Sequence, residues 1–357
     1  MRILSVVGAR PNFMKLAPLA HELARRKVEH VIVHTGQHYD ADMSASFLDT
    51  LAIPSPDFNL AVGSGTHAQQ TAAVMQGFEP VCLETQPDVV LVYGDVNSTV
   101  AAALVAAKLG IRVGHVEAGL RSRDWSMPEE INRVVTDRLS DLLFTPARDA
   151  WDNLRAEGAA AERVHFVGNI MIDSLVALLP QAVSRNGHAH EPYALVTLHR
   201  PANVDDPAVL RELLDALAEL GKERQILFPV HPRTRARMRA LGWAPEGIAL
   251  RDPVPYLEML SLVLRSDLVI TDSGGLQEET SFLGVPCLTV RPNTERPITC
   301  REGTNRLVAA RREPLLAAAR EVVRNGTGRS APPTIERWDG HAARRIAAVL
   351  CDNARFD

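Results

Sequence analysis

Short apolar runs alternate with longer helix-like segments along the chain, and this alternation restricts the possible folds more than any other feature of the sequence. The runs have the composition of buried strands and cover residues 3–7, 30–34, 89–93, 111–116, 142–145, 165–167, 194–198, 225–230, 268–271 and 287–290. Helical segments such as residues 13–26 and 97–109 separate them. Strands that alternate with helices form parallel sheets with helices on both faces, so the sequence predicts an α/β protein.

The pattern of strands and helices runs through twice. The chain has 357 residues, which is too long for one ordinary core, so two domains are expected. The first set of strands ends near Gly168, and the second set begins after it. We predict two doubly wound Rossmann-like domains that face each other across a cleft, with the boundary between residues 168 and 169.

Composition argues against several classes of protein. A hydrophobic share of 46% and a charged share of 23% are normal for a soluble globular protein, and a net charge of −4 lacks the basic footprint of a nucleic-acid binder. The most apolar helical segment, residues 99–109, is interrupted by Lys108 and is too short to span a membrane. The N-terminus lacks the apolar region of a signal peptide. Four cysteines without CxxC spacing indicate no metal cluster, no disulfide framework and a cytoplasmic location.

Acidic residues follow two of the buried strands in the first half. Asp95 and Glu117 each come after such a strand, and Glu130 lies in the first turn of the next helix. Because the carboxyl ends of parallel strands meet at one edge of a sheet, these carboxylates are expected to gather there and to perform acid/base chemistry. Glu129 points about 100° away from Glu130, so only one of the two can face the cleft. Purely structural roles would be helix caps, acids that favour a helix N-terminus, and a surface salt-bridge ladder of Glu130, Arg133 and Asp137.

The second half contains a glycine turn between a buried strand and a helix. Ser273, Gly274 and Gly275 follow the strand at residues 268–271. Glycines let backbone N–H groups approach a ligand and a helix N-terminus favours negative charge, so the turn is predicted to hold a diphosphate. Glu279, one helical turn further on, could accept hydrogen bonds from both hydroxyls of a ribose. A capped helix with glycines for tight packing would also fit this pattern, and the absence of a GxGxxG fingerprint argues against NAD.

Basic and histidine side chains follow other strands. Arg10 and Lys15 come after the first strand and are expected to reach a base, a phosphate or a sugar. His199 and His231 end strands of the second half, where a histidine can donate to a phosphate or transfer a proton. Solvated cations and hydrogen-bonded structural histidines are equally good interpretations of these residues.

Together these segments make the chain resemble the non-hydrolysing UDP-N-acetylglucosamine 2-epimerases over nearly its whole length. The motifs that carry the resemblance are Gly8-Ala-Arg-Pro-Asn12, Thr35-Gly-Gln-His38, Gly94-Asp95, His115-Val-Glu-Ala-Gly-Leu-Arg121, Pro128-Glu-Glu-Ile-Asn-Arg133, His199-Arg200 and Asp272-Ser-Gly-Gly-Leu-Gln-Glu-Glu279. The resemblance implies a glycosyltransferase-B-like fold whose C-terminal helix crosses back, so that residues 338–357 join residues 1–168 while residues 169–337 bind UDP. It also implies a homodimer, and no cofactor or metal in the chemistry.

The resemblance implies a reaction as well. A base removes the C2 proton of UDP-N-acetylglucosamine, UDP leaves from C1, and a 2-acetamidoglucal forms; protonation of the opposite face and return of UDP give UDP-N-acetylmannosamine. The family's catalytic carboxylates match Asp95, Glu117 and Glu130, and its catalytic histidine matches His199. We expect Asp95 and Glu117 to transfer the proton, Glu130 to orient the sugar or share the proton, and His199 to steady the leaving diphosphate; which carboxylate acts on which face stays open. Its nucleotide contacts match Arg10, Lys15, His231, Ser273, Gly274, Gly275 and Glu279.

Two segments depart from the family pattern. Many bacterial members have His-Arg-Arg-Glu-Asn and Gln-His-Arg-Glu-Met where this chain has His199-Arg-Pro-Ala-Asn203 and Gln37-His-Tyr-Asp-Ala-Asp-Met43. In the family, the region near the second motif helps to bind an activating substrate molecule, so such activation stays open here. The same variants resemble relatives that act on other UDP-2-acetamido sugars, including UDP-2,3-diacetamido-glucuronic acid. The sequence is also compatible with a glycosyltransferase or a hydrolysing epimerase on the same scaffold, and with a catalytically silent UDP-sugar sensor.

Overall fold

The protein, described by a computed structural model, divides into two compact units. Unit 1 comprises Met1–Ser174 and Glu336–Asp357, and unit 2 comprises Leu175–Ile335. The structure describes residues 1–36, 50–185, 192–243, 247–324 and 332–353, without the side chains of Arg10 and Asn353. Each unit is an open α/β sheet with its own buried apolar core.

Among its described residues, unit 1 contains a seven-stranded parallel sheet. Its strands are β1 (Arg2–Val7), β2 (Glu29–His34), β3 (Phe58–Asn59), β4 (Val89–Tyr93), β5 (Arg112–Val116), β6 (Leu142–Thr145) and β7 (Val164–Phe166). Their order across the sheet is β3-β2-β1-β4-β5-β6-β7. The direction of winding reverses between β1 and β4, and in doubly wound sheets ligands bind beyond the carboxyl ends of the strands at this switch point.

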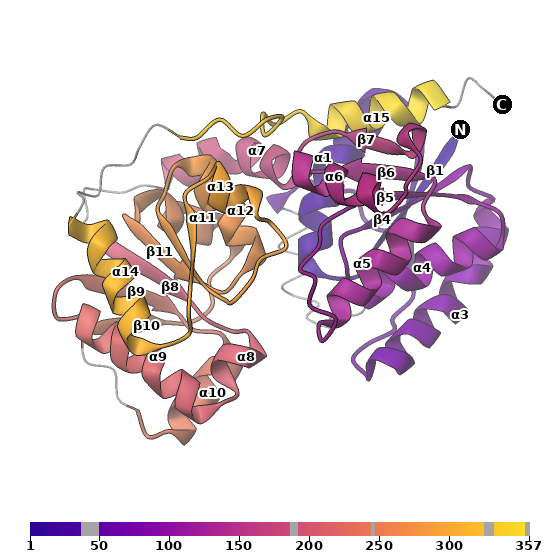
Figure 1. Cartoon of the computed structure of the whole chain (residues 1–357). Coiled ribbons are helices and arrows are strands. Elements are labelled where there is room, and N and C mark those ends of the chain that lie inside the picture. Colours follow the sequence, from indigo (N-terminus) through magenta and orange to yellow (C-terminus); the bar gives the residue numbers. More distant parts are fainter. Residues whose placement is uncertain (37–49, 186–191, 244–246, 325–331, 354–357) are drawn as a thin grey trace. The chain divides into compact units, whose positions relative to one another are not determined.

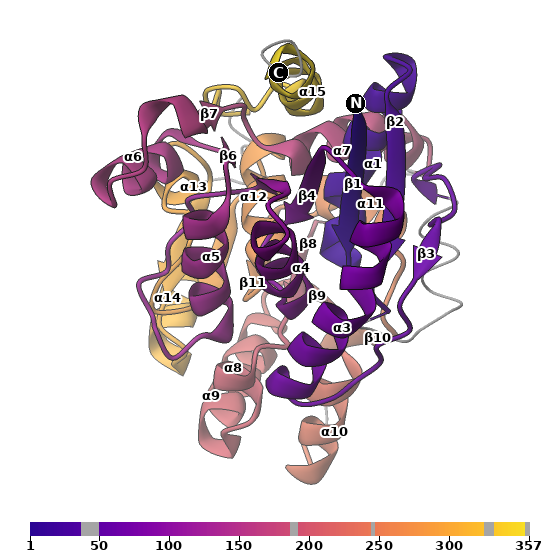
Figure 2. The ribbon, with the colours of Figure 1, turned by 90° about the vertical axis from the view of Figure 1, so that its right-hand side faces the viewer.

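Helices cover both faces of the sheet in unit 1. They are α1 (Arg10–Arg25), α3 (His67–Thr85), α4 (Asn97–Lys108), α5 (Pro128–Leu139), α6 (Arg148–Ala156), α7 (Ile170–Ser184), which continues into unit 2, and α15 (Ala342–Asn353). Figure 2 shows α3, α4 and α5 as neighbours, with α4 in contact with both of the others. The small side chains of Ala101, Ala102 and Ala103 are fully buried and allow this close packing.

Unit 2 repeats the architecture with a six-stranded parallel sheet among its described residues. The strands are β8 (Tyr193–Thr197), β9 (Gln225–Pro229), β10 (Ile248–Arg251), β11 (Leu268–Thr271), β12 (Cys287–Val290) and β13 (Asn305–Val308), in the order β10-β9-β8-β11-β12-β13. The helices are α8 (Pro201–Val204), α9 (Pro207–Leu220), α10 (Pro232–Ala240), α11 (Tyr256–Arg265), α12 (Gly274–Leu283), α13 (Ile298–Arg301) and α14 (Arg312–Arg324). The switch point of this sheet lies between β8 and β11.

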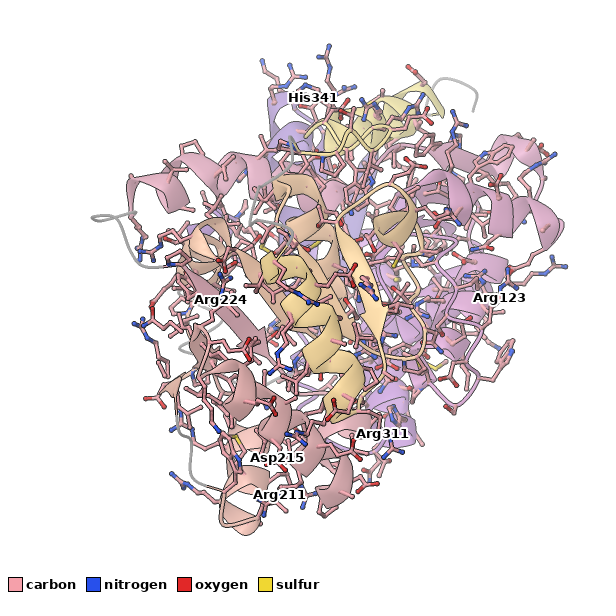
Figure 3. All side chains as sticks on the ribbon, turned by 60° about the vertical axis from the view of Figure 1, so that its left-hand side comes forward. Arg123, Arg211, Asp215, Arg224, Arg311 and His341 are labelled. Carbon is pink, nitrogen blue, oxygen red and sulfur yellow. The ribbon has the colours of Figure 1, made fainter. Side chains whose placement is uncertain are left out.

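Ion pairs line the outer side of the contact between α9 and α14. Arg311, which Figure 3 labels at the start of this region, lies 2.8 Å from Glu212 through its Nη1 atom, and Arg320 pairs with Glu219 at 2.7 Å. These exposed arginines are therefore part of a solvated helix face.

Over the described ranges of the chain, no helix combines the length and the apolar character needed to cross a membrane.

The predicted α/β fold is confirmed strand by strand. Each apolar run named above forms a strand whose ends differ by no more than one residue from the prediction. The sequence missed β3, β10 and β13, which lie at or next to sheet edges. β10 and β13 mix buried with exposed positions, and β3 has only two residues, so none of them leaves a continuous apolar run.

The C-terminal segment returns to unit 1, as the family resemblance implied. Helix α15 packs on α1, and Figure 1 shows it in yellow beside the first elements of the chain. The carboxylate of Asp173 accepts hydrogen bonds from the N–H groups of Ala342 and Ala343, at 3.0 and 2.8 Å, and so caps the start of α15. Just upstream, the indole N–H of Trp338 donates to the carbonyl oxygen of Pro146 at 3.1 Å.

Gly168 allows this return. Its φ is +89°, and a Cβ atom at this position would overlap the carbonyl oxygen of Arg337 in the returning segment. Gly158, also in unit 1, has a similar φ of +82°, but a Cβ there would meet nothing within 4 Å. The two glycines share a backbone conformation and differ only in the approach of the second chain segment.

Gly168→Ala is therefore expected to destabilise unit 1 by clearly more than Gly158→Ala. Both substitutions force a left-handed backbone conformation, which costs about 1–2 kcal/mol, but only the first also collides with backbone. Urea denaturation and hydrogen exchange in α15 measure the difference. Equal losses of stability in the two variants would contradict this account of the crossing.

Candidate active site

Polar side chains of unit 1 gather at the carboxyl ends of β1, β4 and β5, on both sides of the switch point. Lys15 comes from the second turn of α1, Asp95 follows β4, and Glu117 follows β5. The parallel register of these strands brings the three positions to one edge of the sheet. The expectation that Asp95 and Glu117 lie at the same edge is therefore met.

Lys15 and Glu117 form a buried ion pair. The Nζ atom of Lys15 contacts Oε2 of Glu117, and their side chains are only 6% and 5% exposed. Removing either charge from water costs several kcal/mol unless the other is present. The pair therefore keeps a carboxylate ionised in a place from which water is largely excluded.

Glu117 adopts an uncommon backbone conformation. Its φ is +77°, in the left-handed region that residues other than glycine rarely adopt. Its N–H donates to the carbonyl oxygen of Phe144 at 3.2 Å, which ties the strained turn to β6. Strained backbone of this kind is concentrated at functional sites, where the surrounding structure holds a side chain in place.

Gly94 leaves room for the ion pair. Its φ is +64°, and a Cβ atom would lie 2.7 Å from Nζ of Lys15 and 3.2 Å from Oε2 of Glu117. Its N–H donates to the carbonyl oxygen of Val116 at 3.0 Å. A larger residue at position 94 would displace the lysine, the glutamate or the turn that carries Asp95.

Asn12 joins the turns after β1 and β4. Its Oδ1 accepts hydrogen bonds from the N–H groups of Gly8 and Ala9, both at 3.1 Å, and its Nδ2 donates to the carbonyl oxygen of Tyr93 at 2.9 Å. Asn12 belongs to a motif that carries the family resemblance, but no role was predicted for it. The structure shows that it fixes the turns from which Lys15 and Asp95 project.

Asp95 is the most accessible carboxylate of this group. Its side chain is 27% exposed, and its Oδ2 accepts hydrogen bonds from Nε and Nη2 of Arg133 at 2.9 and 2.8 Å. The same guanidinium donates from Nη1 to Oε2 of Glu130 at 2.5 Å. Arg133 therefore links the two carboxylates and leaves an edge of Asp95 open.

Glu130 is buried and saturated with hydrogen bonds. Its oxygens accept from the N–H and the hydroxyl of Ser122, at 2.9 and 3.0 Å, and from the N–H of Arg123 at 2.8 Å. Burial alone would raise the pKa of Glu130, but these donors and Arg133 together lower it. The surface-ladder interpretation is wrong, since Glu130 and Arg133 are 1% and 2% exposed, whereas Glu129 is half-buried.

In unit 2, the corresponding switch point holds His199 against Asp272. Nδ1 of His199 lies 3.1 Å from Oδ1 of Asp272, and the histidine side chain is 42% exposed. Asp272 is fully buried and also accepts the backbone N–H groups of His199 and Arg200, at 3.0 and 2.9 Å. The carboxylate thus places the proton on Nδ1 and turns Nε2 away from itself. Asp272 lies in the glycine motif, but its role as an orienting group was not predicted from the sequence.

His231 lies beside His199, with ring centroids 5.9 Å apart. Its Nδ1 accepts a hydrogen bond from the N–H of Arg233 at 3.2 Å and caps α10, so the ring hydrogen is on Nε2. Burial, and then the positive charges of His199 and Arg233, lower the pKa of His231. The ring is therefore a neutral Nε2–H donor at neutral pH.

At the glycine turn after β11, Gly274 is closely packed and Gly275 is not. A Cβ atom on Gly274 would lie 2.8 Å from Nη1 of Arg296 and 2.9 Å from Oε1 of Glu295, so this glycine is required by packing. A Cβ on Gly275 would meet nothing within 4 Å, and the hydroxyl of Ser273 does not cap α12. The start of the helix at Gly275 therefore has open space beside its backbone.

Arginines after β12 are engaged with carboxylates inside unit 2. Arg296 lies 2.8 Å from Glu278 and 2.5 Å from Glu295, and Arg291 lies 2.8 Å from Glu295. The sequence alone does not distinguish such a buried ionic cluster from free anion-binding cations. Arg296 and its partner Glu295 lie directly against Gly274 of the glycine turn.

Glu279 is 4% exposed and receives a hydrogen bond from the hydroxyl of Tyr256 at 3.0 Å. Burial raises the pKa of Glu279 from 4.5 to about 8, and Glu278 adds to this effect. Tyr256, which comes from α11, was not identified from the sequence, because nothing in the sequence shows that α11 packs beside α12.

Some predicted elements lie outside the described residues, namely the side chain of Arg10 and the motif at residues 37–43.

A pocket of about 470 Å³ in unit 1 is lined by side chains that include Arg121, Trp125 and Glu130. Of the predicted site residues it contains Glu130 alone. Where the structure describes side chains, no group of three His, Cys, Asp or Glu residues is arranged to hold a metal.

Comparison with known proteins identifies the family. The family model described as UDP-N-acetylglucosamine 2-epimerase matches residues 21–351. The chain belongs to the UDP-N-acetylglucosamine 2-epimerase family. A UDP-2,3-diacetamido-2,3-dideoxy-D-glucuronate 2-epimerase of Pseudomonas aeruginosa is 45% identical to this epimerase-family chain over 358 residues, covering 98% of the chain and 99% of that relative.

Solved structures agree with this assignment. The UDP-GlcNAc 2-epimerase of Methanocaldococcus jannaschii, in complex with UDP-GlcNAc and UDP, has a TM-score of 0.90 and 39% identity, over 99% of this chain and all (100%) of that one. A spinosyn rhamnosyltransferase in complex with spinosyn aglycone has a TM-score of 0.54 at 15% identity, over 100% of both chains. At that identity the likeness concerns the fold alone. The glycosyltransferase-B-like architecture expected for this epimerase family is therefore confirmed.

The stability of unit 2 should depend on the ionisation of Glu279. Its pKa is about 8 in the folded protein and 4.5 without the burial, so the folded state binds an extra proton between these values. The free energy of unfolding is expected to fall as pH rises from 5 to 8, and to fall less in Glu279→Gln. Urea denaturation at a series of pH values measures this, with the exposed Glu302→Gln as control. The same pH dependence in both variants would show that Glu279 is not the group responsible.

Proposed function

We propose that this protein is a 2-epimerase of UDP-2-acetamido sugars, which interconverts UDP-N-acetylglucosamine and UDP-N-acetylmannosamine. Membership of the family supports this activity. The observation that carries it is the buried Lys15–Glu117 pair on a strained turn at the switch point of unit 1. A C2 hydrogen is weakly acidic, and its removal needs an ionised base shielded from water and a partner that accepts the displaced charge.

The reaction is an elimination followed by a re-addition. Glu117 and Asp95 exchange the C2 proton with opposite faces of the sugar: one removes it, the C1–O bond breaks, and UDP leaves with the bonding electrons. The other, which has taken a proton from water, protonates C2 of the 2-acetamidoglucal, and the diphosphate oxygen adds back to C1. The proton on the first carboxylate then returns to water. When Glu117 is protonated, Lys15 loses its counter-charge and becomes available to the negative charge that develops on UDP.

Glu130 supports this exchange without transferring the proton. Its oxygens already receive the donors of Ser122, Arg123 and Arg133. It fixes the guanidinium of Arg133, which in turn orients Asp95. This gives Glu130 a role in orienting Asp95, which differs from both roles expected from the sequence, orienting the sugar or sharing the proton.

Unit 2 binds the nucleotide in this proposal. The residues assigned to UDP are His231, Ser273, Gly274, Gly275 and Glu279 of unit 2, with Arg10 and Lys15 of unit 1. The open backbone beside Gly275 and the Nε2–H of His231 support binding of the diphosphate. His199, whose Nε2 is turned outward by Asp272, steadies the leaving diphosphate. Assembly as a homodimer and a cytoplasmic location complete the proposal; the first rests on the family resemblance and the second on the scattered cysteines.

The relative from Pseudomonas aeruginosa favours one alternative substrate, UDP-2,3-diacetamido-glucuronic acid. The reaction at C2 would be the same, because that sugar also carries a 2-acetamido group and a UDP at C1. The two substrates differ at C3 and C6, where the carboxylates described here have no role. Both sugars therefore belong in the first assay.

Proton NMR in D₂O tests the activity. The purified protein is incubated with UDP-N-acetylglucosamine, and in parallel with UDP-2,3-diacetamido-glucuronic acid, without cofactor or metal. The proposal predicts an epimer that carries deuterium at C2. Transfer that requires an acceptor, release of a free sugar, or binding of UDP-sugar without exchange would instead indicate a glycosyltransferase, a hydrolysing epimerase or a silent sensor.

Glu117→Gln is expected to lower kcat by about 10²–10⁴-fold, because the amide can neither remove nor return a proton. Calorimetry should show that UDP still binds, at least as tightly as to the wild type, because the nucleotide residues of unit 2 are untouched and Lys15 loses its counter-charge. Glu129→Gln, on a half-buried neighbour without an assigned role, is the control. Near-wild-type turnover of Glu117→Gln would remove Glu117 from the mechanism.

A further inference from the structure

His115 is a fully buried residue of β5 whose two ring nitrogens both face oxygen atoms. Nδ1 lies 2.6 Å from Oδ1 of Asp137, which comes from α5, and Nε2 lies 2.8 Å from the carbonyl oxygen of Gly94. A carbonyl oxygen can only accept, so Nε2 carries a hydrogen. The state of Nδ1 then depends on Asp137.

Asp137 is an ionised carboxylate. Its Oδ2 accepts the N–H of Gly119 at 3.1 Å and lies 2.7 Å from Nη1 of Arg121. Burial alone would raise the pKa of Asp137, but His115 and Arg121 together lower it. Asp137 therefore holds the Nδ1 side of the ring while Nε2 donates to Gly94, so the His115 side chain is fixed at both nitrogens.

Asp137 is itself held in place by a chain of side chains. Arg121 is held on its other side by Glu157, at 2.9 Å from Nε and 2.7 Å from Nη2, and Glu157 is 42% exposed. Glu157, Arg121 and Asp137 thus form a connected chain of charged groups from the surface to His115 in the sheet. This chain fixes the carboxylate that contacts Nδ1 of His115.

The hydrogen bond from His115 fixes the turn on which Asp95 stands. The N–H of Gly94 is bound by Val116, and its carbonyl oxygen is bound by His115, so the residue is held to β5 at both ends. Gly94 also packs against the ammonium of Lys15 and the carboxylate of Glu117. The orientation of the Gly94–Asp95 peptide therefore sets where Asp95 lies relative to the buried pair.

We propose that His115, held in place by Asp137, is a positioning residue for the epimerisation: it aligns Asp95 with the Lys15–Glu117 pair through its hydrogen bond to the carbonyl group of Gly94. The inference rests on the proposed function. It concerns a residue that touches no substrate and that acts through the backbone.

Two substitutions distinguish the contact of His115 with Asp137 from its hydrogen bond to Gly94. In His115→Gln the amide nitrogen occupies the place of Nε2 and can still donate to Gly94, whereas in His115→Asn it occupies the place of Nδ1 and can reach only Asp137. His115→Asn is expected to lower kcat by about 10²-fold at unchanged KM, the loss that follows a misplacement of about 1 Å. His115→Gln should recover most of that loss, although it breaks the contact with Asp137.

Thermal unfolding and UDP affinity are measured on both variants, so that loss of fold is separated from loss of positioning. Equal kcat values in two folded variants, or wild-type kcat in His115→Asn, would overturn the inference. If wild-type protein exchanges no C2 hydrogen with either sugar, it is the proposed function that fails, and that is seen before any variant is made.

The hydrogen on Nε2 provides a second test that does not depend on activity. In ¹⁵N-histidine-labelled wild-type protein, Nε2 of His115 should give the signal of an N–H group that donates to Gly94, with the assignment taken from its loss in His115→Gln. An Nε2 atom without a hydrogen would overturn the inference.

Discussion

Two opposite charges, on Lys15 and Glu117, are held out of water beyond the carboxyl ends of β1 and β5, and neither could remain there alone. The rest of the site in unit 1 follows from accommodating them. Glu117 takes a left-handed backbone conformation to direct its carboxylate toward Lys15, and position 94 must be glycine because any Cβ would touch both charged groups. The turn that carries Asp95 is thereby built around the pair, and Asp95 becomes its accessible neighbour.

The two units contribute different chemistry. Unit 1 supplies carboxylates, each with a cationic partner: Glu117 with Lys15, and Asp95 with Arg133. Unit 2 supplies a helix start with open backbone at Gly275 and two histidines. In the proposed function, the first set transfers the proton and the second binds the diphosphate that leaves and returns. The same type of doubly wound sheet is compatible with both sets of residues. In each unit the turns at the switch point carry the polar residues, and the strands form the core.

Much of this could be predicted from the sequence, and the reason is topological. Asp95 and Glu117 were found because parallel strands end at a common edge, so a strand pattern alone brings their positions together. Roles that depend on side chains from elements distant in the sequence were not found: His115 with Asp137 on α5, His199 with Asp272 after β11, and Glu279 with Tyr256 on α11. The positive φ of Glu117 could not be predicted from the sequence either, since a glutamate shows no local preference for that conformation. Periodicity identifies buried strands, but it does not show which polar residues of separate elements meet.

The claim that UDP detaches from the sugar while unit 1 moves the proton is tested most directly by positional isotope exchange. UDP-N-acetylglucosamine labelled with ¹⁸O in the oxygen between C1 and the β-phosphorus is incubated with the enzyme, and ³¹P NMR follows the label. The account predicts that the label moves from the bridging into the non-bridging positions of the β-phosphate as epimerisation proceeds, because free UDP can rotate before it returns. Epimerisation with the label still entirely in the bridging position would mean that the C1–O bond never breaks, and would contradict the account.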